Sequence, residues 1–172
     1  MLRPVKIPFG KINLTNSDVL YARTSAQYYD VLVSCFRPSE IRGLDIDSLN
    51  SKTNFKFHDV GDFASLYNDK DVAFFQMMQT LYDEVPKIAN GEYGTDVLLH
   101  CYAGVSRSSA LTLWLMAHCE PEMSADDLFY YLKMHINPYA DPNPAFLNWI
   151  SEFDDRTVAT KNFHTLANRN YE

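Results

Sequence analysis

Residues 97–116 read VLLHCYAGVSRSSALTLWLM, and the rest of the chain can be interpreted outward from them. The apolar run that leads into His100 and Cys101 is typical of a buried strand. The next residues include one glycine, Gly104, and the sequence after Arg107 is rich in strong helix formers. The pattern therefore predicts a strand, a tight loop and a helix, in that order along the chain.

A loop of this kind, between a strand and a helix, is suited to binding an anion. Backbone N–H groups at a helix start have no partner within the helix, and the helix dipole favours negative charge there. Gly104 allows the backbone to turn where a side chain would clash. The planar guanidinium of Arg107 can bind two phosphate oxygens at once, and Cys101 is expected at the floor of the site.

Nucleophilic chemistry at this site requires Cys101 to be a thiolate. Free cysteine has a pKa of about 8.5, whereas cysteines at helix starts beside cations reach roughly 3.5–7.5. A shift of about 3 units requires about 4 kcal/mol, and a helix dipole supplies at most about 2 kcal/mol. The loop amides, Arg107 and the Ser108 hydroxyl are therefore expected to share the stabilisation of the sulfur.

The order His100-Cys101, five residues, then Arg107-Ser108 resembles the signature of the cysteine-based protein tyrosine phosphatases. With Gly104 in the middle and further serines after the arginine, the stretch is most similar to the compact dual-specificity branch. The resemblance implies an α/β fold with a short, mostly parallel central sheet flanked by helices. The other interpretation is a core cysteine at the end of a strand and an arginine on a solvated helix face.

The resemblance also implies roles for the individual residues. Cys101 is expected to attack phosphorus, Arg107 to hold the phosphate, and Ser108 to stabilise the departing thiolate. His100 is expected to order the loop through backbone hydrogen bonds. This chemistry requires no metal and no cofactor. The phosphate oxygens are expected to bind the backbone N–H groups of Tyr102, Ala103, Gly104, Val105, Ser106 and Arg107.

The leaving oxygen needs a proton, and in the family this acid is an aspartate on a loop upstream of the cysteine. Asp59 is the first candidate because it closes a predicted strand, and ligands bind beyond the carboxyl ends of parallel strands. We expect two adjacent strands to bring Asp59 and Cys101 to one edge of the sheet. The stretch between them is longer than in the smallest dual-specificity members, which leaves alternatives open. These are Asp62, Asp69, Asp71 and Asp141.

The substrate prediction rests on the variable positions of the loop and on nearby aromatic residues. None of the variable loop positions is basic, and inositol-lipid phosphatases of this superfamily usually place lysine there, so a lipid substrate is disfavoured. Phe63 and Tyr67 are candidates to line the cleft and stack on an aromatic ring. The expected substrate is a protein or peptide that carries phosphotyrosine, with phosphoserine and phosphothreonine as further substrates.

Two other functions remain open on the sequence. One is a binding module that keeps the loop but lacks a working acid. The other is sulfur transfer or arsenate reduction in the same loop geometry. Arsenate reduction generally needs further cysteines, and neither Cys35, in a predicted strand, nor Cys119, on the helix, is expected to be well placed for Cys101.

Composition excludes several classes of protein. The chain has 172 residues with a net charge of −7, which argues against binding to nucleic acid or to an anionic membrane. No apolar run approaches the roughly 18 residues of a membrane span, and the N-terminus lacks an apolar signal region. Three irregularly spaced cysteines do not make a disulfide framework. A thiolate enzyme needs a reducing compartment, so a cytoplasmic location is expected.

The remaining pattern alternates strands with helices, which favours a parallel sheet covered on both faces. We expect one domain over residues 1–172, with 1–23 as a lead-in segment and about 158–172 as a terminal tail, for which a helix is an open alternative. Strands are predicted at 11–14, 19–21, 30–36, 54–60 and 96–100, the first two as a hairpin. Helices are predicted at 24–29, 42–51, 69–90, 106–119, 124–135 and from 143 onward.

Overall fold

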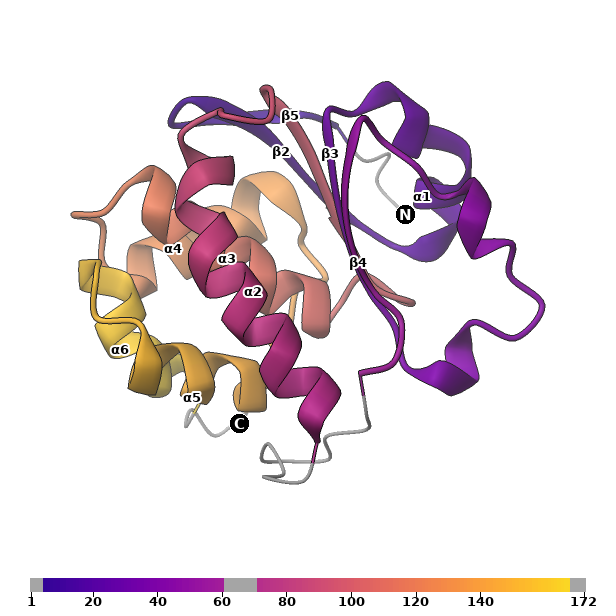
Figure 1. The fold of residues 1–172 in the computed structure, drawn as a ribbon. Helices are drawn as coiled ribbons and strands as arrows, with labels where there is room; N and C mark the ends of the chain where they lie inside the picture. Colours follow the sequence, from indigo (N-terminus) through magenta and orange to yellow (C-terminus); the bar gives the residue numbers. More distant parts are fainter. Residues whose placement is uncertain (1–4, 61–70, 168–172) are drawn as a thin grey trace.

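The computed structural model describes residues 5–60 and 71–167. Its five strands form one sheet in the order β1-β2-β5-β3-β4 (Figure 1). Strands β2, β5, β3 and β4 run parallel to one another, and β1 runs antiparallel to β2. The predicted short, mostly parallel sheet is therefore confirmed. The strands are β1 (Ile7–Phe9), β2 (Ile12–Ser17), β3 (Val31–Cys35), β4 (Thr53–Phe57) and β5 (Asp96–His100).

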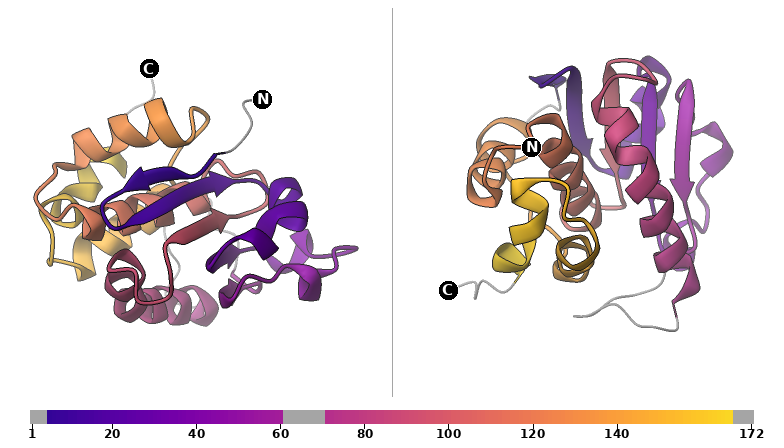
Figure 2. Two further views of the ribbon diagram at one scale, coloured as in Figure 1. Left: turned by 90° about the horizontal axis from the view of Figure 1, so that it is seen from above. Right: turned by 60° about the vertical axis from the view of Figure 1, so that its left-hand side comes forward.

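Helices cover both faces of this sheet, unequally. The helices α2 to α6 lie on one face, and α1 with short 3-10 turns lies on the other (Figures 1 and 2). A π-helical segment, Leu132–Ile136, continues α4. The helices are α1 (Val19–Ser25), α2 (Val72–Ala89), α3 (Arg107–Cys119), α4 (Ala125–Tyr131), α5 (Pro144–Phe153) and α6 (Val158–Ala167). The 3-10 turns are Ala26–Tyr28, Pro38–Glu40 and Ile46–Ser48.

The central strands are buried on both faces, as their nearly continuous apolar sequence requires. Val33 of β3 and Leu99 of β5 pack toward the larger helical layer. Leu32 and Leu98, which point the other way, pack with residues of α1 and the following turns. The helix α3 is buried along nearly its whole length, so the segment that leads out of β5 passes through the middle of the core.

Several helices begin where a side chain caps the first turn. Ser124 accepts from the N–H of Asp127 at the start of α4, and Asn143 accepts from the N–H groups of Ala145 and Phe146 in the first turn of α5. Asp71, one of the alternative acids, accepts from the N–H of Phe74 and so caps α2.

Two predictions for the N-terminal part of the chain need correction. Residues 19–21 begin α1 and are not a strand, because Asp18 accepts from the N–H of Tyr21 and caps a helix. The hairpin instead joins β1 to β2 through Gly10, whose φ is +58°. Most of the expected terminal tail is the helix α6, which was the open alternative for this segment, and its Phe163 and Leu166 are buried in the core.

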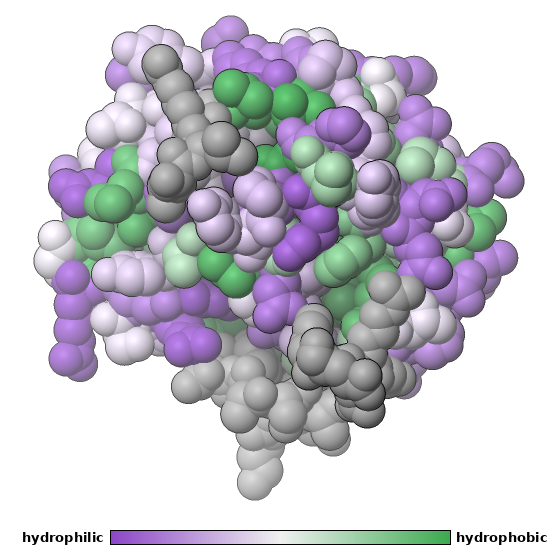
Figure 3. All heavy atoms as spheres, turned by 180° about the vertical axis from the view of Figure 1, so that it is seen from behind, coloured by the Kyte–Doolittle hydropathy of each residue, from purple (hydrophilic) through white to green (hydrophobic). Residues whose placement is uncertain are grey.

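The described surface is mixed in polarity. Figure 3 shows hydrophilic residues spread over the rear face, with hydrophobic residues in separate patches between them. Among the described helices, none combines the length and the apolar composition needed to cross a membrane.

Candidate active site

The parallel strands end at one edge of the sheet, and Cys101 lies at the middle of that edge. β5 pairs with β2 on one side and with β3 on the other, and Cys101 follows its last residue, His100. Open α/β sheets bind ligands beyond this edge. We call residues 101–107 the cradle loop, which ends at Arg107, the first residue of α3.

The carbonyl groups of the cradle loop are held by hydrogen bonds from outside the loop. Because a trans peptide is planar, its N–H group points opposite to its C=O group. Because these carbonyls point out of the loop, the N–H groups of the residues that follow them point into it, as anion binding requires. The bonds run from Val19 N to Tyr102 O (3.0 Å), Asn137 Nδ2 to Gly104 O (2.7 Å), Asp141 N to Val105 O (2.8 Å) and Asn143 N to Ser106 O (3.0 Å).

Gly104 allows the cradle loop to lie directly against the end of β2. Its φ of +73° is in the left-handed region that favours glycine. A Cβ at this position would lie 2.5 Å from the carbonyl carbon of Ser17 and 2.8 Å from the N of Asp18. Both contacts are with backbone atoms, which cannot rotate away as a side chain can.

The sulfur of Cys101 lies under the loop, beside a hydroxyl. Cys101 is 2% exposed, and its Sγ is 3.3 Å from the Oγ of the fully buried Ser108. His100 is also fully buried, and its Nδ1 is 3.1 Å from the carbonyl O of Cys101. Burial lowers the pKa of His100 to about 4, so the ring is neutral at neutral pH and Nδ1 donates this bond.

Arg107 is anchored by a glutamate that the sequence did not single out. Its terminal nitrogens donate to the two carboxylate oxygens of Glu40 at 2.6 and 2.7 Å. Burial opposes ionisation of Glu40, but hydrogen bonds from Arg107 and from the N–H of Arg37 outweigh it and lower the pKa of the carboxyl group. Glu40 lies in a 3-10 turn after β3, so no local signal in the sequence links it to the loop.

The candidate acids differ in their position relative to the cradle loop. Asp59 is exposed two residues beyond β4, at the same edge of the sheet as Cys101. β3 lies between β4 and β5, so the expectation that Asp59 and Cys101 follow adjacent strands is wrong. Asp141 is exposed, and its backbone N–H donates to the carbonyl O of Val105 in the loop. Asp62, Phe63, Tyr67 and Asp69 lie outside the described residues.

The remaining cysteines, Cys35 and Cys119, and the histidine His118 at the end of α3 differ in their position relative to Cys101. Cys35 follows the residue of β3 that pairs with His100, and it lies closer to Cys101 than expected. Burial, with a smaller contribution from Cys101, raises the pKa of the Cys35 thiol to about 12. Cys119 ends α3, at the opposite end of the helix from the loop. His118 bonds to Asp154, and within residues 5–60 and 71–167 no three potential ligands cluster as a metal site would require.

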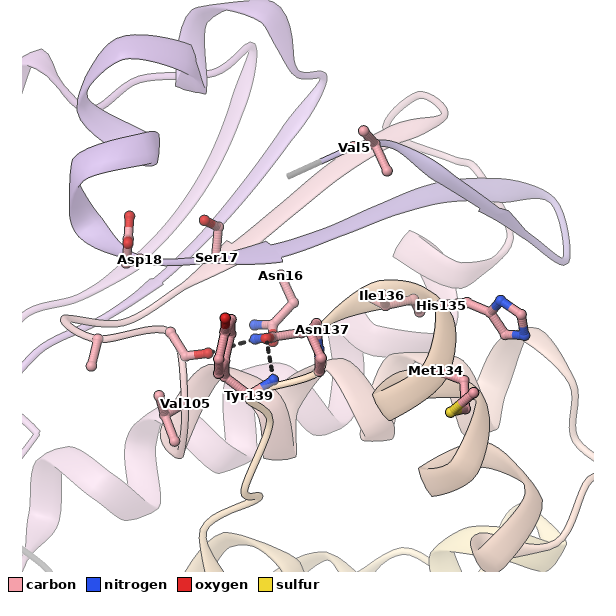
Figure 4. Close-up of a pocket in the computed structure, with 13 residues that line it drawn as sticks. Val5, Asn16, Ser17, Asp18, Val105, Met134, His135, Ile136, Asn137 and Tyr139 are labelled. Atoms are coloured by element: carbon pink, nitrogen blue, oxygen red, sulfur yellow. Dashed lines mark hydrogen bonds between the residues drawn. The ribbon is translucent and has the colours of Figure 1, made fainter. Parts of the chain in front are cut away.

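A cavity of about 530 Å³ opens beside the cradle loop (Figure 4). The backbone of Gly104 and the side chains of Asp18 and Tyr139 contribute to its walls. Cys101 and Arg107 are not among the lining residues, so the cavity does not include the sulfur or the guanidinium.

A model of the dual specificity phosphatase catalytic domain matches residues 15–156 of the chain. The chain belongs to this family. The match begins within β2, ends just beyond α5 and contains the whole cradle loop. It confirms the resemblance that was predicted from the order of His100, Cys101 and Arg107, and makes the chain a phosphatase domain.

Solved phosphatase structures share the fold at low sequence identity. DUSP15 is similar with a TM-score of 0.58 and 17% identity, over 98% of this chain and 97% of that one. Tk-PTP in the active form has a TM-score of 0.56 and 16% identity, over 91% of this chain and 99% of that one. PTPMT1 in complex with PI(5)P has a TM-score of 0.54 and 14% identity, over 91% of this chain and 90% of that one. These likenesses establish the fold alone, and no curated protein sequence is significantly similar.

Replacing Gly104 of this phosphatase domain with alanine is expected to lower kcat/KM for p-nitrophenyl phosphate by about 10²-fold or more, because the loop must move off β2. Gly91→Ala is the matched control. Gly91 has a φ of +78° but would place its Cβ in open space, so the substitution costs about 1–2 kcal/mol of strain and leaves kcat/KM unchanged. Equal losses of activity in the two variants would contradict the prediction.

Replacing Glu40 with glutamine is expected to lower kcat/KM about tenfold. The amide keeps the size of the side chain but loses the charge and one of the two acceptors that fix the Arg107 guanidinium. Steady-state kinetics would measure the effect, with the exposed Glu92→Gln as the control. Unchanged kinetics in Glu40→Gln would show that the ion pair does not hold the arginine for catalysis.

Proposed function

We propose that the chain is a cysteine-dependent phosphomonoester hydrolase that acts on phosphotyrosine in proteins or peptides. The observation that supports the proposal most strongly is the cradle loop, with its carbonyls held outward over a buried cysteine. A phosphoryl group needs donors around its equatorial oxygens and a nucleophile in line with its leaving group. The loop amides and Arg107 are suited to the first need, and Cys101 to the second.

In the first step, the Cys101 thiolate attacks phosphorus, and the bond from phosphorus to the ester oxygen breaks. Loop N–H groups and Arg107 stabilise the charge on the equatorial oxygens. Asp59 gives its proton to the leaving oxygen, which departs as a hydroxyl. The product of this step is a cysteinyl-phosphate.

In the second step, water attacks phosphorus and Asp59, now a carboxylate, takes the proton of the water. The bond between phosphorus and sulfur breaks, and inorganic phosphate leaves. The Ser108 hydroxyl stabilises the departing thiolate of Cys101 from 3.3 Å. Neither step needs a metal or a cofactor, and a thiolate of this kind is best preserved in a reducing cytoplasm.

Replacing Asp59 with alanine is expected to reduce kcat for a phosphotyrosine peptide by about 10²-fold, the contribution of a positioned general acid. The loss should be smaller for p-nitrophenyl phosphate, whose leaving group needs less protonation. Asp62→Ala and Asp141→Ala are the matched variants, because both residues are alternative acids. The assignment to Asp59 is wrong if either of these loses more activity than Asp59→Ala.

The substrate class is tested with the wild-type chain under reducing conditions. Matched peptides with phosphotyrosine, phosphothreonine or phosphoserine are compared with PI(5)P, the molecule in the PTPMT1 complex. We expect the phosphotyrosine peptide to have the highest kcat/KM, because no lysine follows Cys101 within the loop to bind a lipid headgroup. Faster hydrolysis of PI(5)P would overturn the substrate proposal. Phosphate binding without turnover on any substrate would support a binding module instead.

A further inference from the structure

Two asparagine side chains from distant parts of the sequence form a hydrogen-bonded row behind the cradle loop. Asn16 lies in β2, Asn137 follows the π-helical segment, and both are buried. Figure 4 shows the two side chains close together, and Asn137 Nδ2 donates to Asn16 Oδ1. The row ends at the hydroxyl of Ser108, beside the sulfur of Cys101. Neither asparagine has a part in the two reaction steps.

The orientation of the Asn137 amide is fixed by two backbone groups. Its Nδ2 donates to the carbonyl O of Gly104 at 2.7 Å, and its Oδ1 accepts from the N–H of Tyr139 at 3.0 Å. Exchanging the nitrogen and the oxygen would place two acceptors together at Gly104 and two donors together at Tyr139. Asn137 therefore presents an N–H donor to Asn16.

The orientation of the Asn16 amide follows from that of Asn137. Its Oδ1 accepts from Asn137 Nδ2 at 2.8 Å and from Ser109 Oγ at 3.2 Å. Its Nδ2 must then donate, and it does so to the carbonyl O of Leu99 at 3.3 Å and to Ser108 Oγ at 2.9 Å. The Ser108 oxygen is thus an acceptor on its Asn16 side, and its single hydrogen is left for another partner.

We propose that Asn16 is a positioning residue that directs the hydroxyl hydrogen of Ser108 toward the sulfur of Cys101. The inference rests on the proposed function, in which that sulfur is first the nucleophile and then the leaving group. A hydrogen bond donated to a thiolate favours its charged form, which helps both steps. Without Asn16, the carbonyl O of Leu99 loses a donor, and the hydroxyl hydrogen can turn toward it instead.

The test follows the alkylation of Cys101 by iodoacetamide as a function of pH, which requires no turnover. Asn16→Ala and Ser108→Ala are each expected to move the midpoint of the rate profile up by about one pH unit, the effect of losing one hydrogen bond to a charged group. In the double variant, the midpoint is expected to equal that of Ser108→Ala, because Asn16 acts through the hydroxyl.

The matched control is Asn13→Ala, on the same strand, whose Nδ2 bonds to Asp96 at 3.0 Å away from the loop; its midpoint should stay at the wild-type value. Cys101→Ser gives the background from the other thiols, and circular dichroism checks folding. An unchanged midpoint in Ser108→Ala overturns the proposal, whatever the Asn16 variants do. Additive shifts in the double variant also overturn it, because Asn16 would then act independently of the hydroxyl. A chain with the expected midpoints but no turnover would count against the proposed function alone.

Discussion

Replacing Cys101 with serine is expected to reduce the hydrolysis of p-nitrophenyl phosphate by about 10⁴-fold or more. A serine hydroxyl is a weak nucleophile unless an adjacent base takes its proton. The contacts of Cys101 supply no such base. Its side chain lies beside the Ser108 hydroxyl, and His100 Nδ1 bonds to the carbonyl O of Cys101 and not to its side chain. The measurement compares kcat for the wild type and the variant in the presence of a reductant and a metal chelator.

The matched control for this loss is Cys119→Ser. Cys119 is partly buried at the far end of α3, and burial raises the pKa of its thiol to about 12, so it carries almost no thiolate at neutral pH. We expect this variant to keep full activity. Cys101→Ser should still bind a phosphotyrosine peptide, because the loop amides and Arg107 remain. Turnover within tenfold of the wild type in Cys101→Ser would eliminate the cysteinyl-phosphate mechanism.

The cradle loop could be predicted because its parts are contiguous in the sequence. The strand before it occupies the predicted residues 96–100, and α3 begins at Arg107, within one residue of the predicted start. An apolar run, one glycine and a run of helix formers act over a few residues each, so they can be recognised without a fold. The family match over residues 15–156 includes this part of the chain.

The supports of the loop could not be predicted in the same way. Glu40, Asn16 and Asn137 reach it from a 3-10 turn, a strand and the end of a helix. In the sequence, each resembles a polar residue of an ordinary turn or surface, and only the packed fold brings them together. The mistaken strand at 19–21 has a related cause, because Val, Leu and Tyr suit a strand until the cap at Asp18 starts a helix.

Replacing Asp154 with alanine is expected to lower the free energy of unfolding by about 3–5 kcal/mol near pH 7, because buried donors lose a charged partner. Asp154 is fully buried at the end of α5. Its carboxylate accepts from Trp114 Nε1 at 2.7 Å, His118 Nε2 at 2.8 Å and Arg156 Nε at 2.8 Å. Urea unfolding measures the loss, and the exposed neighbour Asp155→Ala should change stability by less than about 0.5 kcal/mol.

The loss from Asp154→Ala should also depend on pH. Burial alone would raise the pKa of Asp154, but hydrogen bonds from His118, Arg156 and Trp114 outweigh it and hold the pKa well below its usual value. A carboxyl group of this kind stabilises the fold fully above its unfolded pKa of about 3.9, and the stabilisation is lost as the pH falls below that value. The difference between wild type and variant should therefore shrink below about pH 4, and a constant difference down to about pH 2 would contradict this account. Because Asp154 joins α5 to α3, the helix that begins at the cradle loop, its removal should lower the folded fraction while the molecules that remain folded keep their kcat.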